Sequence, residues 1–259
     1  MSTPIISISG ATVKLNNQVV LDDINLEIKR PSFLLVVGPN GAGKTTLLKT
    51  LLGLIKPYRG EIRVFGLNPL REGTRVRRLV GYVPQKDRVS YEIPLTVGEV
   101  VLMGVLLKKS PPRTVSEEDI KAAKEALASL GMDDKWASFF NELSGGQQRR
   151  VLIARSLAFN PSLLLLDEIF AGLDLESQDM LLGLLKAFKE SGKTVIVVEH
   201  ELDPVINLAD KVLVLNRSIH VYGEPDIVLG EDKLRQIYPH LKSIERNGKR
   251  VIILGDRHA

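Results

Sequence analysis

The 259-residue chain contains no cysteine. This absence excludes a disulfide framework, a thiolate metal site and a cysteine nucleophile. Long apolar runs are also lacking, because the longest, at 100–107 and 163–166, fall far short of the roughly 20 residues that a membrane-spanning helix needs. The first ten residues show no basic flank before an apolar stretch, so no signal peptide is predicted. We therefore expect a cytosolic protein whose contact with a membrane, if any, is made through a partner.

The composition is that of an ordinary globular protein. The hydrophobic share of 44% and the charged share of 25% exclude disordered, collagen-like and coiled-coil chains. The length suits one large domain, or a core that carries an inserted subdomain. With 35 basic and 31 acidic residues the formal charge is only +4, which permits contact with nucleic acid but does not demand it. No nucleic-acid partner is expected.

The first third of the chain predicts strands and then one helix. Segments 5–9 and 24–28 alternate apolar and polar residues, which is typical of half-buried antiparallel strands. Asn16-Asn17 predicts a turn between residues 13–15 and 19–21. The segment FLLVV at 33–37 is apolar on both faces, so it predicts a strand inside a sheet. A helix is predicted over 44–52, ending at Gly53.

The later part of the chain predicts a parallel sheet. Continuous apolar strands are expected at 163–167, 194–199 and 211–215, with helices at 176–190 and 204–209 between them. Strands that alternate with helices indicate a mostly parallel sheet covered on both faces. The predicted class is therefore α/β, with a parallel core, an N-terminal antiparallel β subdomain and an inserted helical subdomain.

The helical insert is expected at about 88–160. Helical spacing runs over 97–107, 116–130 and 145–158, and Ser116 followed by Asp119 resembles a capping box. The apolar stripe at positions 97, 100, 101 and 104 predicts packing inside the insert, with docking of a membrane partner as the alternative. Residues from about 231 to 259 form a short C-terminal extension, with one short helix and a final strand at 250–254. The whole chain, 1–259, is expected to be a single domain.

The strongest chemical signal is a phosphate-binding loop. The pattern GxxxxGK[ST] is matched between the strand at 33–37 and the helix that follows it, which is the context that the motif requires. Glycines let the backbone turn its N–H groups toward phosphate oxygens, while Lys44 neutralises the β- and γ-phosphates and Thr45 offers a hydroxyl to Mg²⁺. The predicted nucleotide-binding residues are Gly38, Pro39, Asn40, Gly41, Ala42, Gly43, Lys44, Thr45 and Thr46.

A pair of carboxylates follows the apolar run at 163–166. Asp167 and Glu168 emerge at the carboxyl end of this strand, where doubly wound sheets hold their ligands. Asp167 is placed to hold Mg²⁺ through water, and Glu168 can polarise a water aimed at the γ-phosphate. Taken alone, such a pair is equally typical of a solvated strand end; the P-loop upstream favours the catalytic interpretation.

The pentapeptide LSGGQ at 143–147 stands at the start of the helix predicted over 145–158. Ser144 and the glycines that follow offer a hydroxyl and N–H groups, which suits a second anion site. Ser144 equally suits a plain N-cap, because serine is a favoured capping residue. The spacing leaves both interpretations open.

These motifs, in this order, resemble the ATP-binding subunit of ABC transporters. The resemblance covers residues 5–230 and rests on GPNGAGKT, Gln85 in YVPQ, LSGGQ, LLLLDE, the AGLD segment ending in Asp174, and His200 after TVIVVE. It implies that two copies pair head to tail and that each ATP lies between the P-loop of one copy and the LSGGQ segment of the other.

The resemblance also implies a role for each matched residue. Ser144, Gly145, Gly146 and Gln147 would contact the ATP bound by the second copy, and Asp174 would lie at the interface between the copies. Gln85 would reach Mg²⁺ and the attacking water, so Mg²⁺ would be held by Thr45, Gln85 and Asp167. Glu168 and His200 would position that water, with His200 bonded to the γ-phosphate. Leu15 stands where the family usually has an adenine-stacking aromatic residue, which predicts weaker or less base-selective nucleotide binding. Ile169 replaces a usual proline and changes no assigned role.

Segments 80–104 and 209–225 resemble the zinc/manganese-type branch of the family. The resemblance therefore implies an ATP-hydrolysing subunit that acts with ATP and Mg²⁺ on an integral-membrane permease, from the cytoplasmic face of the cell membrane. The alternative is a soluble ABC-type ATPase of iron–sulfur cluster assembly that acts on a scaffold protein. DNA-repair and ribosome-acting relatives and small-molecule kinases fit less well, because the chain lacks a long coiled-coil insert, carries one motif set and includes LSGGQ.

Overall fold

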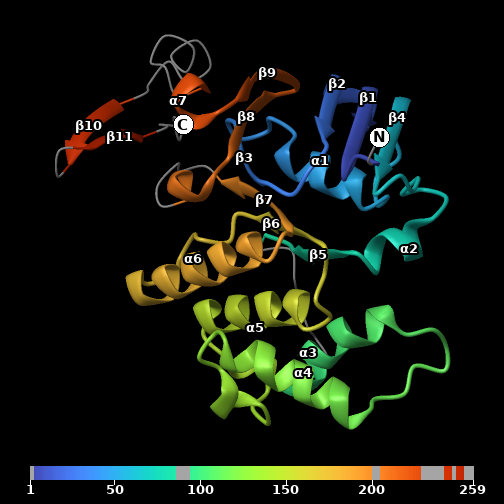
Figure 1. Cartoon of the computed structure of the whole chain (residues 1–259), viewed down its shortest axis with the longest axis vertical. Coiled ribbons are helices and arrows are strands. Elements are labelled where there is room, and N and C mark those ends of the chain that lie inside the picture. The colour runs from blue at the N-terminus through green and yellow to red at the C-terminus, as the bar shows by residue number, and fades with distance from the viewer. Residues whose placement is uncertain (1–2, 86–93, 200–204, 229–241, 247–248, 254–259) are drawn as a thin grey trace. The chain divides into compact units, whose positions relative to one another are not determined.

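The computed structural model describes residues 3–85, 94–199, 205–228, 242–246 and 249–253 (Figure 1). The chain divides into two compact units, which are described separately. The first unit contains Met1–Val76 and Lys189–Ala259, and the second contains Arg77–Phe188. The helical subdomain expected at about 88–160 falls within the sequence of the second unit. In the described part of the chain, no helix is long and apolar enough to cross a membrane.

An antiparallel sheet opens the first unit. β1 (Ile6–Leu15) is the central strand, between β2 (Gln18–Ile28) and β4 (Arg59–Val64). Asn16 and Asn17 form the two-residue turn between β1 and β2, with φ values of 48° and 63°. Such a hairpin turn requires positive φ at both positions, which asparagine tolerates better than most residues. The antiparallel subdomain is therefore confirmed, although β1 and β2 are longer and more continuous than the alternation predicted.

The second sheet of the first unit is mostly parallel. β3 (Phe33–Val37) lies between β7 (Thr194–Glu199) and β8 (Lys211–Asn216), and both neighbours run parallel to it. β9 (Ser218–Gly223) adds an antiparallel edge strand on β8. Every residue of β3 and β7 is buried, as the continuous apolar runs predicted. The predicted strands at 33–37, 194–199 and 211–215 are confirmed.

The remaining elements of the first unit are short. α1 (Lys44–Leu51) follows β3, and α7 (Pro225–Val228) follows β9. The helix expected at 204–209 is wrong in its described part, which forms only one 3₁₀ turn, η5 (Ile206–Leu208). Near the C-terminus β10 (Lys242–Arg246) pairs with β11 (Lys249–Ile253), which confirms the final strand and adds a partner for it. The short helix expected in this tail falls outside the described residues.

The second unit combines a strand pair with helices. β5 (Val80–Val83) pairs in parallel with β6 (Leu163–Asp167). α2 (Gly73–Arg77) precedes β5 in the chain and, except for Arg77, belongs to the first unit. The longer helices are α3 (Val97–Val105), α4 (Glu117–Ala128), α5 (Gly145–Leu157) and α6 (Leu175–Glu190). Three 3₁₀ turns connect them: η2 (Leu106–Lys108), η3 (Asp133–Lys135) and η4 (Phe140–Glu142). The four predicted helices are confirmed, and so is the capping box of Ser116 and Asp119 at the start of α4.

Helix α3 packs tightly on α5. Its stripe at positions 97, 100, 101 and 104 is buried, so the packing interpretation of that stripe is confirmed. At Gly104 the two helices approach so closely that a Cβ atom would lie 2.0 Å from the carbonyl oxygen of Arg155. Because that oxygen belongs to the backbone of α5, it cannot move aside as a flexible side chain would.

We predict that Gly104→Ala destabilises the protein. The added methyl group forces the helices apart, at a cost of about 1–3 kcal/mol for overpacking, whereas alanine regains at most about 1 kcal/mol of helix propensity. Chemical denaturation measures the free energy of unfolding. Gly183→Ala in α6 is the matched control, because no atom lies within 4 Å of its added Cβ. This variant should not lower the free energy of unfolding. Equal stability of the two variants would contradict the predicted close approach.

Candidate nucleotide-binding site

The P-loop runs from the end of β3 to the start of α1, and its glycines are required by geometry. Gly43 is the N-cap of α1 and has φ 96°. A Cβ atom there would lie 2.6 Å from Cδ2 of Leu21 and 2.8 Å from the carbonyl oxygen of Val20. At Gly38 a Cβ atom would lie 2.1 Å from the carbonyl oxygen of Leu215. The loop is therefore fixed by the backbones of β2 and β8, which leave no room for larger residues.

Lys44 is the central charge of this loop. Its side chain is 5% exposed, and Nζ donates to the carbonyl oxygens of Gly38 at 2.7 Å and Pro39 at 3.2 Å. A buried ammonium group is costly unless it is hydrogen-bonded, and these carbonyls hold it within the loop. The first N–H groups of a helix have no partner inside it, so the start of α1 suits an anion. The structure thus brings the cation and the helix start together, as the motif predicted.

A backbone bridge that sequence reasoning missed supports the loop from the side. Arg217, in the turn between β8 and β9, donates its N–H to the carbonyl oxygen of Ala42 at 2.9 Å. Its own carbonyl oxygen accepts from the N–H of Asp22 at 2.7 Å. Arg217 has φ 61°, so the turn holds a non-glycine residue in the left-handed region. The only sequence signal was the polar Asn216-Arg217 pair between two apolar strands.

The end of β1 presents an apolar surface. Leu15 is 40% exposed, and Val19 on the paired strand is 37% exposed. The nearby Lys14 ammonium group lies 3.8 Å from the centre of the Tyr58 ring, in a cation–π contact. Leu15 thus presents an exposed aliphatic side chain at the position where the resemblance expects an aromatic one.

The carboxylate pair lies in the second unit, at the end of β6. Asp167 is fully buried, and its Oδ2 accepts from the Tyr82 hydroxyl at 3.5 Å. Glu168 has φ 53°, a strained conformation for a residue with a side chain. Its Oε2 accepts from Nε2 of Gln85 at 2.5 Å. The structure therefore brings Gln85 and Glu168 into direct contact, although 83 residues separate them in the chain.

Arg149 stabilises this strained turn. Its side chain is 5% exposed and donates through Nη1 to the carbonyl oxygen of Glu168 at 2.5 Å. This hydrogen bond orients the peptide group that follows β6, so it also fixes the backbone position from which the Glu168 side chain extends. Sequence reasoning missed this residue, because two adjacent arginines after LSGGQ give no sign of which one turns inward.

Ser144 caps α5, so the capping interpretation of LSGGQ is confirmed. Its Oγ accepts from the N–H of Gln147 at 3.4 Å, and Oε1 of Gln147 accepts from the N–H of Ser144 at 3.0 Å. A Cβ atom on Gly146 would lie 3.8 Å from Cδ2 of Leu173, so the AGLD turn is adjacent to this helix start. Capping leaves the second interpretation, an anion site, as a prediction.

Asp174 begins α6 in the same way. Its Oδ1 accepts from the N–H of Ser177 at 2.8 Å. That hydrogen bond lowers the pKa of the Asp174 carboxyl below its ordinary value, so the group is ionised at neutral pH. The acidic side chain predicted for the interface between copies is therefore an exposed anion.

The predicted site residues thus form two groups, one in each unit. The P-loop belongs to the first unit, whereas Gln85, LSGGQ, the carboxylate pair and Asp174 belong to the second. His200 lies outside the described residues. Among those residues no group of three histidine, aspartate or glutamate side chains forms a metal cluster. The predicted magnesium ligands Thr45, Gln85 and Asp167 nevertheless offer a hydroxyl, an amide and a carboxylate oxygen. These are donors that Mg²⁺ accepts, because it binds through oxygen atoms and keeps several of its waters.

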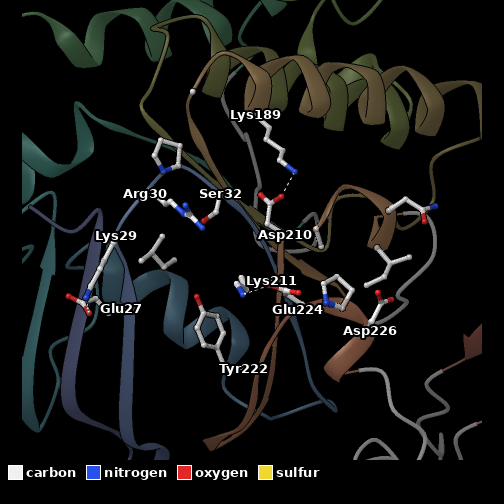
Figure 2. Close-up of a pocket in the computed structure, with 17 residues that line it drawn as sticks. Glu27, Lys29, Arg30, Ser32, Lys189, Asp210, Lys211, Tyr222, Glu224 and Asp226 are labelled. Atoms are coloured by element: carbon white, nitrogen blue, oxygen red, sulfur yellow. Dashed lines mark hydrogen bonds and ion pairs between the residues drawn. The ribbon is translucent and has the colours of Figure 1, made fainter. Parts of the chain in front are cut away.

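A separate pocket of about 1180 Å³ lies in the first unit, at the opposite end of β3 from the P-loop (Figure 2). Three ion pairs line it: Glu27 with Lys29, Asp210 with Lys189 and Glu224 with Lys211. Asp210 also accepts from the N–H of Phe33 at 2.8 Å, which fixes the start of β3. Arg30 and Asp226 line the pocket as well. Because the pocket lies away from the P-loop, it is assigned no part in nucleotide binding.

A buried strand, a glycine-rich loop around a buried lysine and a helix define a P-loop nucleotide-binding protein. The family model described as "ABC transporter" matches residues 21–171. The chain is 36% identical over 233 residues to the manganese transport system ATP-binding protein MntB of Bacillus subtilis, covering 90% of this chain and 92% of that protein. It is also 36% identical to the zinc transport system ATP-binding protein TroB of Treponema pallidum, covering 90% and 86%.

Solved structures agree with this assignment. The dimeric structure of MJ0796, a bacterial ABC transporter cassette, has a TM-score of 0.75 and 31% identity over 85% of this chain and 98% of that one. The chain belongs to the ABC transporter family as an ATP-binding subunit. The predicted fold class and the resemblance to the zinc/manganese-type branch are confirmed, and the comparisons do not favour the iron–sulfur assembly alternative.

We predict that the protein binds ATP and GTP with similar affinity. An aliphatic side chain such as Leu15 contacts either purine without reading its hydrogen-bonding edge, so the affinities should agree within about fivefold, or 1 kcal/mol. Competition titrations with a fluorescent nucleotide measure the ratio. A preference for ATP of about 100-fold or more would require base-specific hydrogen bonds and would contradict the prediction. Leu15→Tyr is the companion variant, and it should tighten the binding of both nucleotides.

Proposed function

We propose that this chain hydrolyses ATP in a head-to-tail dimer and thereby drives a separate membrane subunit of a manganese- or zinc-type transporter. The observation that carries the proposal is the P-loop, whose buried Lys44 is held by loop carbonyls at the start of α1. This arrangement supports triphosphate binding. The dimeric cassette among the related structures supports pairing of two copies.

Hydrolysis is assigned to the carboxylate pair. The Glu168 carboxylate accepts the proton of the attacking water, and Gln85, which contacts it at 2.5 Å, holds that water in line with the γ-phosphate. His200 completes the hydrogen bonds to the γ-phosphate. Thr45, Gln85 and Asp167 would hold Mg²⁺, which neutralises charge on the phosphates.

The second copy completes the site. Ser144, Gly145, Gly146 and Gln147 present the start of α5 to the γ-phosphate bound by the other P-loop. Asp174, an exposed anion that follows Leu173 beside Gly146, lies at the interface between the copies. Since ATP contacts both copies, its hydrolysis removes the contact that holds them together.

The membrane partner and cargo follow from the relatives. MntB is named for manganese transport and TroB for zinc transport, both as ATP-binding proteins of transport systems. We assign this chain the same place: at the cytoplasmic face of the cell membrane, bound to an integral-membrane permease that carries a divalent metal ion.

We predict that Glu168→Gln binds ATP, hydrolyses it at least about 100-fold more slowly, and accumulates as a dimer. The amide is isosteric but cannot accept the proton from water. Single-turnover assays measure hydrolysis, and light scattering after gel filtration measures the dimer. A variant that hydrolyses ATP at the parental rate would remove Glu168 from its role.

Lys44→Ala is the companion variant to Glu168→Gln, because it separates loss of nucleotide binding from loss of hydrolysis. It should lose nucleotide binding itself, because it removes the cation at the phosphate site together with the hydrogen bonds of Lys44 to the loop carbonyls. Unaltered affinity for ATP in Lys44→Ala would contradict the P-loop assignment. Circular dichroism checks that both variants keep the fold.

We further predict that the chain co-purifies with a polytopic membrane subunit and that Mn²⁺ or Zn²⁺ stimulates ATP hydrolysis by the complex in vesicles. Stimulation requires that the metal reach the permease, so it should vanish in Glu168→Gln. Ca²⁺ at the same concentration serves as the control. Co-purification with a soluble iron–sulfur scaffold in place of a membrane subunit would contradict the transport assignment.

A further inference from the structure

We infer that Trp136, through its contact with Gly98, is a positioning residue for the LSGGQ segment. The inference rests on the proposed function, in which LSGGQ contacts ATP bound by a second copy. It concerns the second unit alone. Neither residue belongs to the predicted site.

The segment before LSGGQ is bonded to the start of α3. Val97 donates its N–H to the carbonyl oxygen of Ser138, and Gly98 donates to that of Trp136, both at 3.0 Å. These two donors belong to the first turn of a helix, where N–H groups otherwise lack partners. Phe140 donates its N–H to the carbonyl oxygen of Leu95 at 2.8 Å. Segments 95–98 and 136–140 therefore form one hydrogen-bonded piece.

The Trp136 ring fills the space that a side chain at position 98 would take. A Cβ atom on Gly98 would lie 2.5 Å from Cε2 of the ring and 2.8 Å from Cζ2. On another side, the ammonium group of Lys124 in α4 lies 5.4 Å from the ring centre. The ring thus contacts Gly98 of α3 and Lys124 of α4, and it links segment 136–140 to both helices. It belongs to the only tryptophan of the chain.

This piece continues directly into LSGGQ. The turn η4 begins at Phe140, whose carbonyl oxygen accepts from Nε2 of Gln148 at 3.1 Å and from the N–H of Leu143 at 3.3 Å. Only three residues separate Phe140 from Ser144, the N-cap of α5. A shift of segment 136–140 therefore shifts the start of α5, the part of LSGGQ that must reach the second nucleotide.

Loss of the ring contact should affect pairing of the copies but not binding of nucleotide to a single copy. The P-loop belongs to the first unit, where it packs on β2 and β8, whereas the contact of Trp136 with Gly98 lies within the second unit. A displacement of about 1 Å in a contacting group can cost up to 100-fold in function. This separation distinguishes a positioning role from general stabilisation.

The test uses the full chain in the Glu168→Gln background, where hydrolysis does not consume the nucleotide. Trp136→Ala should raise the ATP concentration needed for half-maximal dimer by about tenfold or more. Affinity of the diluted monomer for a fluorescent ATP analogue should stay within about twofold. Trp136→Phe retains a ring against Gly98 and should restore most of the pairing.

Gly98→Ala tests the same contact with the ring in place, and it serves as well if Trp136→Ala fails to fold. The added methyl group must displace Trp136, so pairing should weaken as in Trp136→Ala. Gly183→Ala is the matched control, because its added Cβ meets open space. In the Trp136→Ala background, Gly98→Ala should cause little further loss, since the two changes break one contact.

Each contrary outcome overturns the inference. If Trp136→Ala and Gly98→Ala each form a dimer at the same ATP concentration as the parent, the contact does not position LSGGQ. If both variants lose monomer nucleotide affinity in proportion to pairing, the role is only structural. If the parent itself never forms a dimer with ATP, the proposed function fails as well, and LSGGQ has no second nucleotide to reach.

Discussion

The ammonium group of Lys44 lies inside a loop of backbone carbonyls, 2.7 Å from that of Gly38, with its side chain 5% exposed. The nucleotide site depends on this arrangement. The loop keeps its path because Gly43 lies directly on the backbone of β2, Gly38 on that of β8, and Ala42 on the N–H of Arg217. Two strands and the turn after β8, far apart in the sequence, thus fix one cation beside the start of α1, where a phosphate group can replace the carbonyls as its partner.

In the second unit the carboxyl end of β6 is bonded to the first turns of α5. Arg149, one turn into α5, holds the carbonyl oxygen of Glu168, and Glu168 in turn accepts from Gln85. The same helix begins at Ser144, beside the turn that carries Asp174. One helix therefore positions both the carboxylate proposed to act on water and the segment proposed to contact the second nucleotide, so these two parts cannot move independently.

The sequence predicted the elements whose signal is local. β3, β6 and β7 were placed to the residue because each is a continuous apolar run, and the P-loop was found because its glycines are dictated by backbone geometry. The edge strands β4 and β9 were missed, since each alternates with exposed residues and buries few side chains. Arg149 and Trp136 were missed for a different reason. Their roles arise from contacts with Glu168 and Gly98, which only the folded chain brings together.

The central claim is that a single copy of this chain holds an incomplete catalytic centre. The dependence of ATP hydrolysis on protein concentration tests it most directly, under saturating ATP and Mg²⁺ and over a dilution series that crosses the dimerisation range. The account predicts that activity per chain rises with concentration and falls toward zero at high dilution. Activity per chain that stays constant while light scattering shows only monomer would contradict it.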